Sequence, residues 1–96
     1  MKTYRDYKLK DLDILIESIQ KENNHQLEKW GIQDASPIEW MLWLTEEIGE
    51  LAQAIAERVY REGDAKDIYK EAIQVVTLAL KIAEGAINDE DWRKKK

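Results

Sequence analysis

The chain has 96 residues, a formal net charge of −5 and no cysteine. That length suits one small domain, so we expect a single domain over residues 1–96. The missing cysteines exclude a disulfide framework and any cysteine-ligated zinc site. The negative charge disfavours nucleic acid as a partner. No apolar stretch approaches the roughly 20 residues of a membrane span, and the polar start lacks a signal-peptide core. We therefore expect a cytoplasmic protein without a membrane partner.

Aliphatic residues and alanine are abundant, and a single proline is present, which favours an all-α chain. The first predicted helix covers about residues 8–29, because apolar side chains recur there at spacings of three and four: Leu9, Leu12, Ile16, Ile19 and Leu27. Gly31 ends it, since glycine readily takes the positive φ of a helix C-terminus. A connector follows at residues 32–35.

The second predicted helix has the clearest start signal in the chain. Ser36 is a good N-cap, Pro37 suits the first helical position, and Glu39 completes a capping box. The helix should continue to about Arg61 or Glu62, where Gly63 stops it.

The third predicted helix covers about residues 65–86 and is capped by Asp64. Between residues 72 and 83 its only polar side chains are Gln74, Thr77 and Lys81. A helix that is apolar nearly all round should be buried on several sides, which three helices rarely achieve alone. A last short helix should start near Asn88. We therefore predict an all-α helical bundle of three long helices plus a short C-terminal helix, completed by oligomerisation.

Two acidic clusters stand on the second and third predicted helices. The first is Glu46-Glu47-Ile48-Gly49-Glu50, and the second contains Glu71. On a helical wheel Glu47 falls within the apolar sector, between Trp40, Leu51 and Ala54. Glu71 is placed in the same way among Ile68, Val75 and Leu78. A carboxylate that faces a core is costly unless a cation or hydrogen bonds satisfy it, so metal binding is the first hypothesis.

The two clusters are not level if both helices leave one tight turn, because Glu47 precedes Gly63 by sixteen residues and Glu71 follows it by eight. If the clusters do meet, two carboxylates about 5 Å apart repel by roughly 3 kcal/mol at an effective dielectric constant of about 20. Three such carboxylates repel in three pairs, so the site would have to bind a proton or a cation. Oxygen ligands without His or Cys suit Mg²⁺ or Mn²⁺, and Mg²⁺ sites commonly serve phosphate chemistry. The alternative is an ordinary face of solvated glutamates.

These residues resemble the MazG-like all-α nucleoside triphosphate pyrophosphohydrolases, whose signature is EExxE followed some twenty residues later by ExxD. The resemblance also includes Glu28-Lys29-Trp30-Gly31 and the Ser36-Pro37 helix start, and it covers roughly residues 20–84. It implies a helical homodimer or homotetramer that uses Mg²⁺ and hydrolyses a (deoxy)nucleoside triphosphate to the monophosphate and pyrophosphate. By position it implies metal ligands at Glu47, Glu50 and Glu71, and a water-orienting role for Glu46.

Gln74 stands where the family pattern has Asp, so we expect an uncharged oxygen ligand and weaker metal binding there. Either the enzyme works with fewer metals or another ligand, or the chain is a catalytically weak nucleotide-binding or regulatory module.

The remaining predicted substrate contacts are weaker. Trp43 is the best candidate for an aromatic ring beside the nucleotide, because it neighbours Glu47 and Glu50 on the helical wheel. Trp30 has the same potential, and Lys29 and Lys81 could meet phosphates, whereas Thr77 could hold a sugar or a water. Each also has a structural interpretation, as packing or solvated charge. We interpret His25, the single histidine, as an exposed or capping residue.

Overall fold

A computed structural model describes residues 1–32 and 34–94; Gln33 of the predicted connector lies outside them. A short 3₁₀ helix, η1 (Tyr4–Tyr7), precedes four α-helices. These are α1 (Leu12–Trp30), α2 (Pro37–Arg61), α3 (Ala65–Ile87) and α4 (Asp89–Arg93). No strand is found among the described residues, so the prediction of an all-α bundle with three long helices and a short C-terminal one is confirmed.

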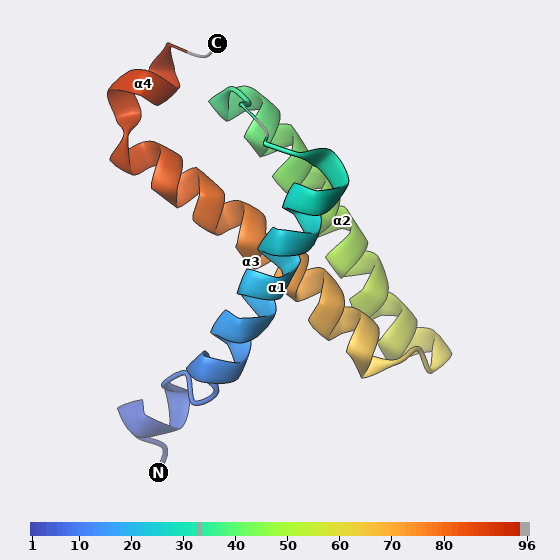
Figure 1. Cartoon of the computed structure of the whole chain (residues 1–96). Helices are drawn as coiled ribbons and strands as arrows, with labels where there is room; N and C mark the ends of the chain where they lie inside the picture. The colour runs from blue at the N-terminus through green and yellow to red at the C-terminus, as the bar shows by residue number, and fades with distance from the viewer. Residues whose placement is uncertain (33, 95–96) are drawn as a thin grey trace.

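Helix α3 is the central element, and α1, α2 and α4 all pack against it. Figure 1 shows α2 and α3 leaving a common turn as a hairpin whose arms diverge, with α1 crossing α3 near its middle. Helix α4 lies at the far end of α3 (Figure 1).

The predicted start of the first helix is wrong. Residues 8–11 lie outside the helices, because Lys8 is extended at φ −72° and ψ 146° and ends η1. Thr3 and Asp6 form a capping box that nucleates this separate 3₁₀ turn. The apolar residues that predicted the helix are also largely exposed: Leu9, Leu12, Ile16 and Leu27.

The two later helices begin where their capping residues predict. Ser36 Oγ accepts a hydrogen bond from Glu39 N at 3.3 Å, while Ser36 N donates to Glu39 Oε1 at 3.2 Å. The Asp64 carboxylate accepts from Lys66 N at 2.9 Å. Each bond satisfies a backbone N–H that the first helical turn cannot pair internally.

The core is small and centres on α3. Trp40 and Leu78 are buried in it with Ala35, and Trp43 meets Trp40 edge-on at 5.2 Å between ring centroids. Trp92 of α4 covers Gly85 so closely that a Cβ there would lie 2.8 Å from the indole ring. Glycine is required at this position because the aromatic ring occupies the space of a side chain.

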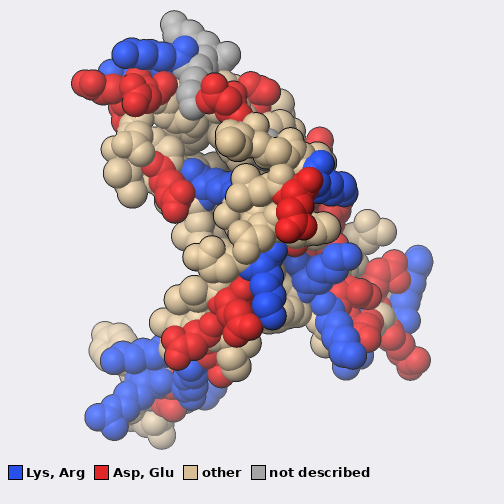
Figure 2. Space-filling model, in the orientation of Figure 1, with Lys and Arg blue, Asp and Glu red and all other residues tan. Residues whose placement is uncertain are grey.

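The accessible surface is large for a chain of this mass. It measures 7975 Å², whereas a compact monomer of 11.3 kDa exposes about 5700 Å², a difference of about 2200 Å². Figure 2 shows basic side chains interspersed with acidic ones, so no continuous band of one sign crosses the visible face. Among the described residues, no helix has the length and apolar character needed to cross a membrane.

Candidate functional site

Three carboxylates from two helices converge beside the core. Glu47 and Glu50 extend from α2 and Glu71 extends from α3, and one oxygen of each lies within 4.8 Å of the others. Glu47 and Glu71 are half-buried, whereas Glu50 is exposed. The i,i+3 spacing on α2 sets the first pair side by side, and the hairpin brings the third carboxylate to them.

The two acidic clusters meet, and the turn between α2 and α3 is tight. Glu62 takes the left-handed conformation at φ 59°, and Gly63 N donates to Glu57 O at 2.9 Å. The left-handed residue ends α2 and reverses the direction of the chain, so α3 packs back along α2. A Cβ on Gly63 would lie 3.1 Å from the Glu57 backbone, a contact tighter than most side chains make.

Gln74 lies between two of these carboxylates. With its amide nitrogen toward them, Nε2 is 2.9 Å from Glu47 Oε2 and 2.9 Å from Glu71 Oε2. Carboxylate oxygens only accept hydrogen bonds, so the nitrogen rather than the oxygen must face them. In this arrangement Gln74 is a hydrogen-bond donor, and it would have to turn its amide over to offer an oxygen to a metal ion.

Two carboxyl groups of the cluster, Glu47 and Glu71, have pKa values above that of an isolated glutamate. Burial, the neighbouring Glu50 charge and a hydrogen bond with Glu50 raise the pKa of Glu47 from 4.5 to about 7. Burial and Glu50 also raise the pKa of Glu71, which Lys70 partly offsets. A cation beside Glu47 and Glu71 would oppose the rise in both pKa values and favour their ionised forms.

The donor set fits a hard divalent cation. Glu47, Glu50 and Glu71 supply carboxylate oxygens within 4.8 Å of one another, and neither sulfur nor imidazole joins them. Mg²⁺ and Mn²⁺ prefer such oxygen ligands and retain positions for water and phosphate.

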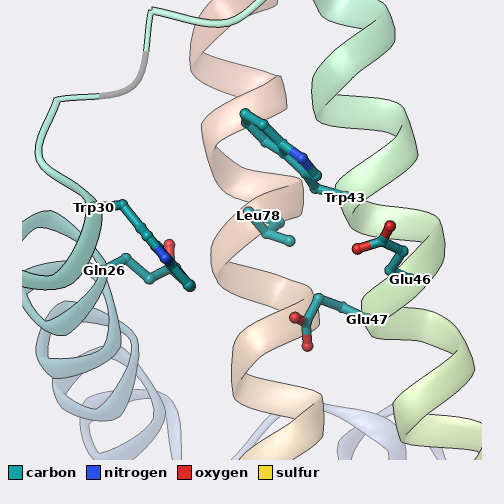
Figure 3. A pocket seen from close by; sticks show the side chains of 6 residues that line it. All are labelled: Gln26, Trp30, Trp43, Glu46, Glu47 and Leu78. Atoms are coloured by element: carbon teal, nitrogen blue, oxygen red, sulfur yellow. The ribbon is translucent and has the colours of Figure 1, made fainter.

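A cavity of about 380 Å³ opens beside the cluster, and Glu46 and Glu47 form one of its sides. Figure 3 shows Trp30 of α1 and Trp43 of α2 extending into it from opposite sides, with Leu78 of α3 between them. The structure therefore brings together both predicted tryptophans and two of the predicted glutamates. Glu46 itself is exposed and stands outside the three-carboxylate group.

The predicted lysines and the threonine occupy different surroundings. Lys29 lies over the Trp30 ring, with Nζ 4.8 Å from its centroid. Lys81 is half-buried, and its Nζ lies 5.6 Å from the Trp40 ring centroid. Thr77 is only 2% exposed and donates its hydroxyl to Ile73 O at 2.7 Å, which leaves it no accessible surface for a sugar.

Gln26 and Glu22 of α1 were not predicted as site residues. Gln26 is buried and lines the cavity, and its Nε2 donates to Glu22 Oε2 at 2.9 Å. Gln26 lies seven residues after Ile19, on the same face of α1. A polar residue on the otherwise apolar face of a helix is the sequence feature that could have indicated Gln26 as a site residue. The histidine is exposed, as expected.

No protein-family model matches the chain, and comparisons with curated proteins and with solved structures give no match either.

Proposed function

We propose that this protein is a Mg²⁺-dependent nucleoside triphosphate pyrophosphohydrolase that acts as a homo-oligomer. The observation that carries the proposal is the convergence of Glu47, Glu50 and Glu71 beside a cavity with two tryptophans at its sides. Such a site combines affinity for a hard cation, which suits a triphosphate, with aromatic surfaces that suit a base. The MazG-like sequence pattern agrees with this chemistry.

In the proposed reaction each group has a separate role. Glu47, Glu50 and Glu71 would hold Mg²⁺, which supplies charge neutralisation and orientation for the phosphates when bound. Glu46, exposed at the cavity, accepts a hydrogen bond from a water molecule and directs it at phosphorus. Attack of this water breaks the α–β phosphoanhydride bond, so a nucleoside monophosphate and pyrophosphate leave. Positioning of this kind, together with electrostatic stabilisation, dominates phosphoryl-transfer catalysis.

A second candidate is a nucleotide-binding or regulatory module with little turnover. Gln74 favours it, because its amide already satisfies Glu47 and Glu71 with two hydrogen bonds of 2.9 Å. Those bonds compete with a cation for the same carboxylate oxygens. The module would then bind a nucleotide through the cavity and release no product.

The homo-oligomer is supported by the surface of α2. Its outward side carries exposed apolar residues at spacings of seven and four: Met41, Ile48, Ile55 and Val59. These spacings place the four side chains on one face of α2, as in the contact surface between two packed helices. The excess surface of about 2200 Å² exceeds the roughly 800 Å² that each partner buries in a standard interface. A second copy of this chain, in a homodimer or homotetramer, is the partner we propose.

Turnover assays separate the two candidates. Release of pyrophosphate and nucleoside monophosphate is measured over a panel of ribo- and deoxyribonucleoside triphosphates with Mg²⁺ or Mn²⁺. The enzyme predicts metal-dependent release that Glu47→Ala abolishes and the matched surface variant Glu57→Ala retains. Saturable nucleotide binding without either product would favour the binding module. Unchanged turnover in folded Glu47→Ala would remove Glu47 from the mechanism.

A further inference from the structure

Gln26 is the most deeply buried polar side chain at the cavity, at 5% exposure. Both ends of its amide are held by ionisable partners. Lys81 Nζ donates to Gln26 Oε1 at 2.8 Å, and Gln26 Nε2 donates to Glu22 Oε2 at 2.9 Å. The Lys81 contact joins α1 to α3 across 55 residues of sequence, whereas the Glu22 contact lies within α1.

The two partners fix which way the amide faces. An ammonium group can only donate and a carboxylate can only accept, so a reversed amide would oppose nitrogen to Lys81 and oxygen to Glu22. A glutamine amide has two N–H groups and two oxygen lone pairs. After both contacts are made, one N–H and one oxygen lone pair of the amide remain, with the positions of nitrogen and oxygen determined.

The cavity around this amide suits a flat aromatic ligand. Trp30 and Trp43 extend into it from opposite sides and Leu78 lies between them (Figure 3), while the volume of about 380 Å³ falls within the range of small-molecule sites. Stacking on indole rings is tolerant of the ring's identity, whereas a buried donor beside an acceptor selects a ligand edge with the complementary pair. Each nucleobase carries such an edge.

We infer that Gln26 is a specificity-determining residue that hydrogen-bonds the base edge of a nucleoside held between Trp30 and Trp43, with Lys81 and Glu22 as positioning residues. The assignment rests on the proposed nucleotide function and adds the group that recognises the base. A nucleoside should therefore bind without phosphate and without metal. Inorganic tripolyphosphate, which has no base, should not depend on Gln26.

The experiment measures two ligands separately in each variant. Binding of the four common ribonucleosides and their deoxy forms is followed by tryptophan fluorescence in EDTA, and binding of tripolyphosphate with Mg²⁺ is followed by calorimetry. At least one nucleoside should bind the wild type saturably. Gln26→Leu should weaken that binding at least tenfold and leave tripolyphosphate affinity within twofold.

Two further variants keep the test informative if Gln26→Leu fails to fold. Gln26→Glu keeps the side-chain shape and can pair with Lys81, but it has no N–H to donate, so nucleoside affinity should again fall tenfold. The double variant Glu22→Gln/Lys81→Gln replaces both charged partners with amides that can donate or accept, so the amide at position 26 can turn over. The differences in affinity among the nucleosides should then become smaller, while the far-ultraviolet circular dichroism stays unchanged. A purely structural role of these residues would not change the relative affinities.

Three results would overturn the assignment: no nucleoside binding by the wild type, undiminished nucleoside binding in both position-26 variants, or an equal loss of nucleoside and tripolyphosphate binding. Failure of the proposed enzyme looks different. Nucleosides would bind in a Gln26-dependent manner, but nucleoside triphosphates would yield no pyrophosphate.

Discussion

We expect that neutralising Glu47 raises the free energy of unfolding of the metal-free protein at neutral pH. Removing a charge that makes a favourable surface contact would lower it. Glu47→Gln keeps the side-chain shape and an oxygen that can accept the hydrogen bond from Gln74 Nε2. It removes the charge that burial and the Glu50 carboxylate make unfavourable, as shown by the rise in the pKa of Glu47 to about 7.

The sign follows from proton binding. Between pH 4.5 and about 7 the unfolded chain releases this proton and the folded chain retains it, so the wild-type free energy of unfolding falls as pH rises through that interval. At about 1.4 kcal/mol for each pH unit between the two pKa values, the full effect is about 3 kcal/mol. Because Glu47 is only half-buried, solvent screening reduces this to about 1–2 kcal/mol.

Thermal melting in EDTA from pH 4 to pH 8 measures the effect. Above pH 7 Glu47→Gln should melt roughly 5–15 °C higher than the wild type, and the two curves should converge near pH 4. The matched control is Glu57→Gln on the same helix, which loses only an ion pair to Arg61 at 3.6 Å and should be neutral or slightly destabilising. A wild type with pH-independent stability, or a Glu47→Gln variant that melts no higher at pH 8, would refute the reasoning.

Three other variants test separate parts of the structure. Gln74→Asp adds a fourth carboxylate, so it should lower the metal-free melting temperature and raise Mg²⁺ affinity; calorimetry that shows equal or weaker binding would contradict this. Gly85→Ala forces a Cβ to within 2.8 Å of the Trp92 ring, so it should cost about 1–3 kcal/mol in chemical unfolding; an unchanged midpoint would show that α4 yields freely. Ile55→Lys places a charge in the apolar face of α2 and should lower the mass measured by light scattering, whereas an unchanged mass would exclude this side of α2 from the interface.

Local signals predicted much of the fold. The capping residues Ser36 and Asp64 fixed the starts of α2 and α3, because each acts on backbone groups within its own first turn. The same kind of signal was available at the N-terminus, where Thr3 and Asp6 cap η1. The apolar periodicity that begins at Leu9 continues into α1, but residues 8–11 are not helical. The periodicity therefore predicts a helix start that is too early.

The site was predictable only in part, because its contacts range from local to distant. The spacing of Glu47 and Glu50 sets that pair on one helix. Their approach to Glu71 depends on how α2 and α3 pack against each other, which no spacing within one helix reveals. Gln26 meets Lys81 through the crossing of α1 over α3, and no spacing within one helix could reveal that contact.

The central claim is that carboxylates from two helices hold a divalent cation. Calorimetric titration of the protein with Mn²⁺ and with Mg²⁺ tests it most directly. The proteins are the wild type, Glu71→Gln from the opposite helix of the cluster, and Glu57→Gln as the control. The account predicts saturable binding to the wild type and the control, weakened at least tenfold in Glu71→Gln. Equal affinity in all three proteins, or no saturable binding to the wild type, would contradict it.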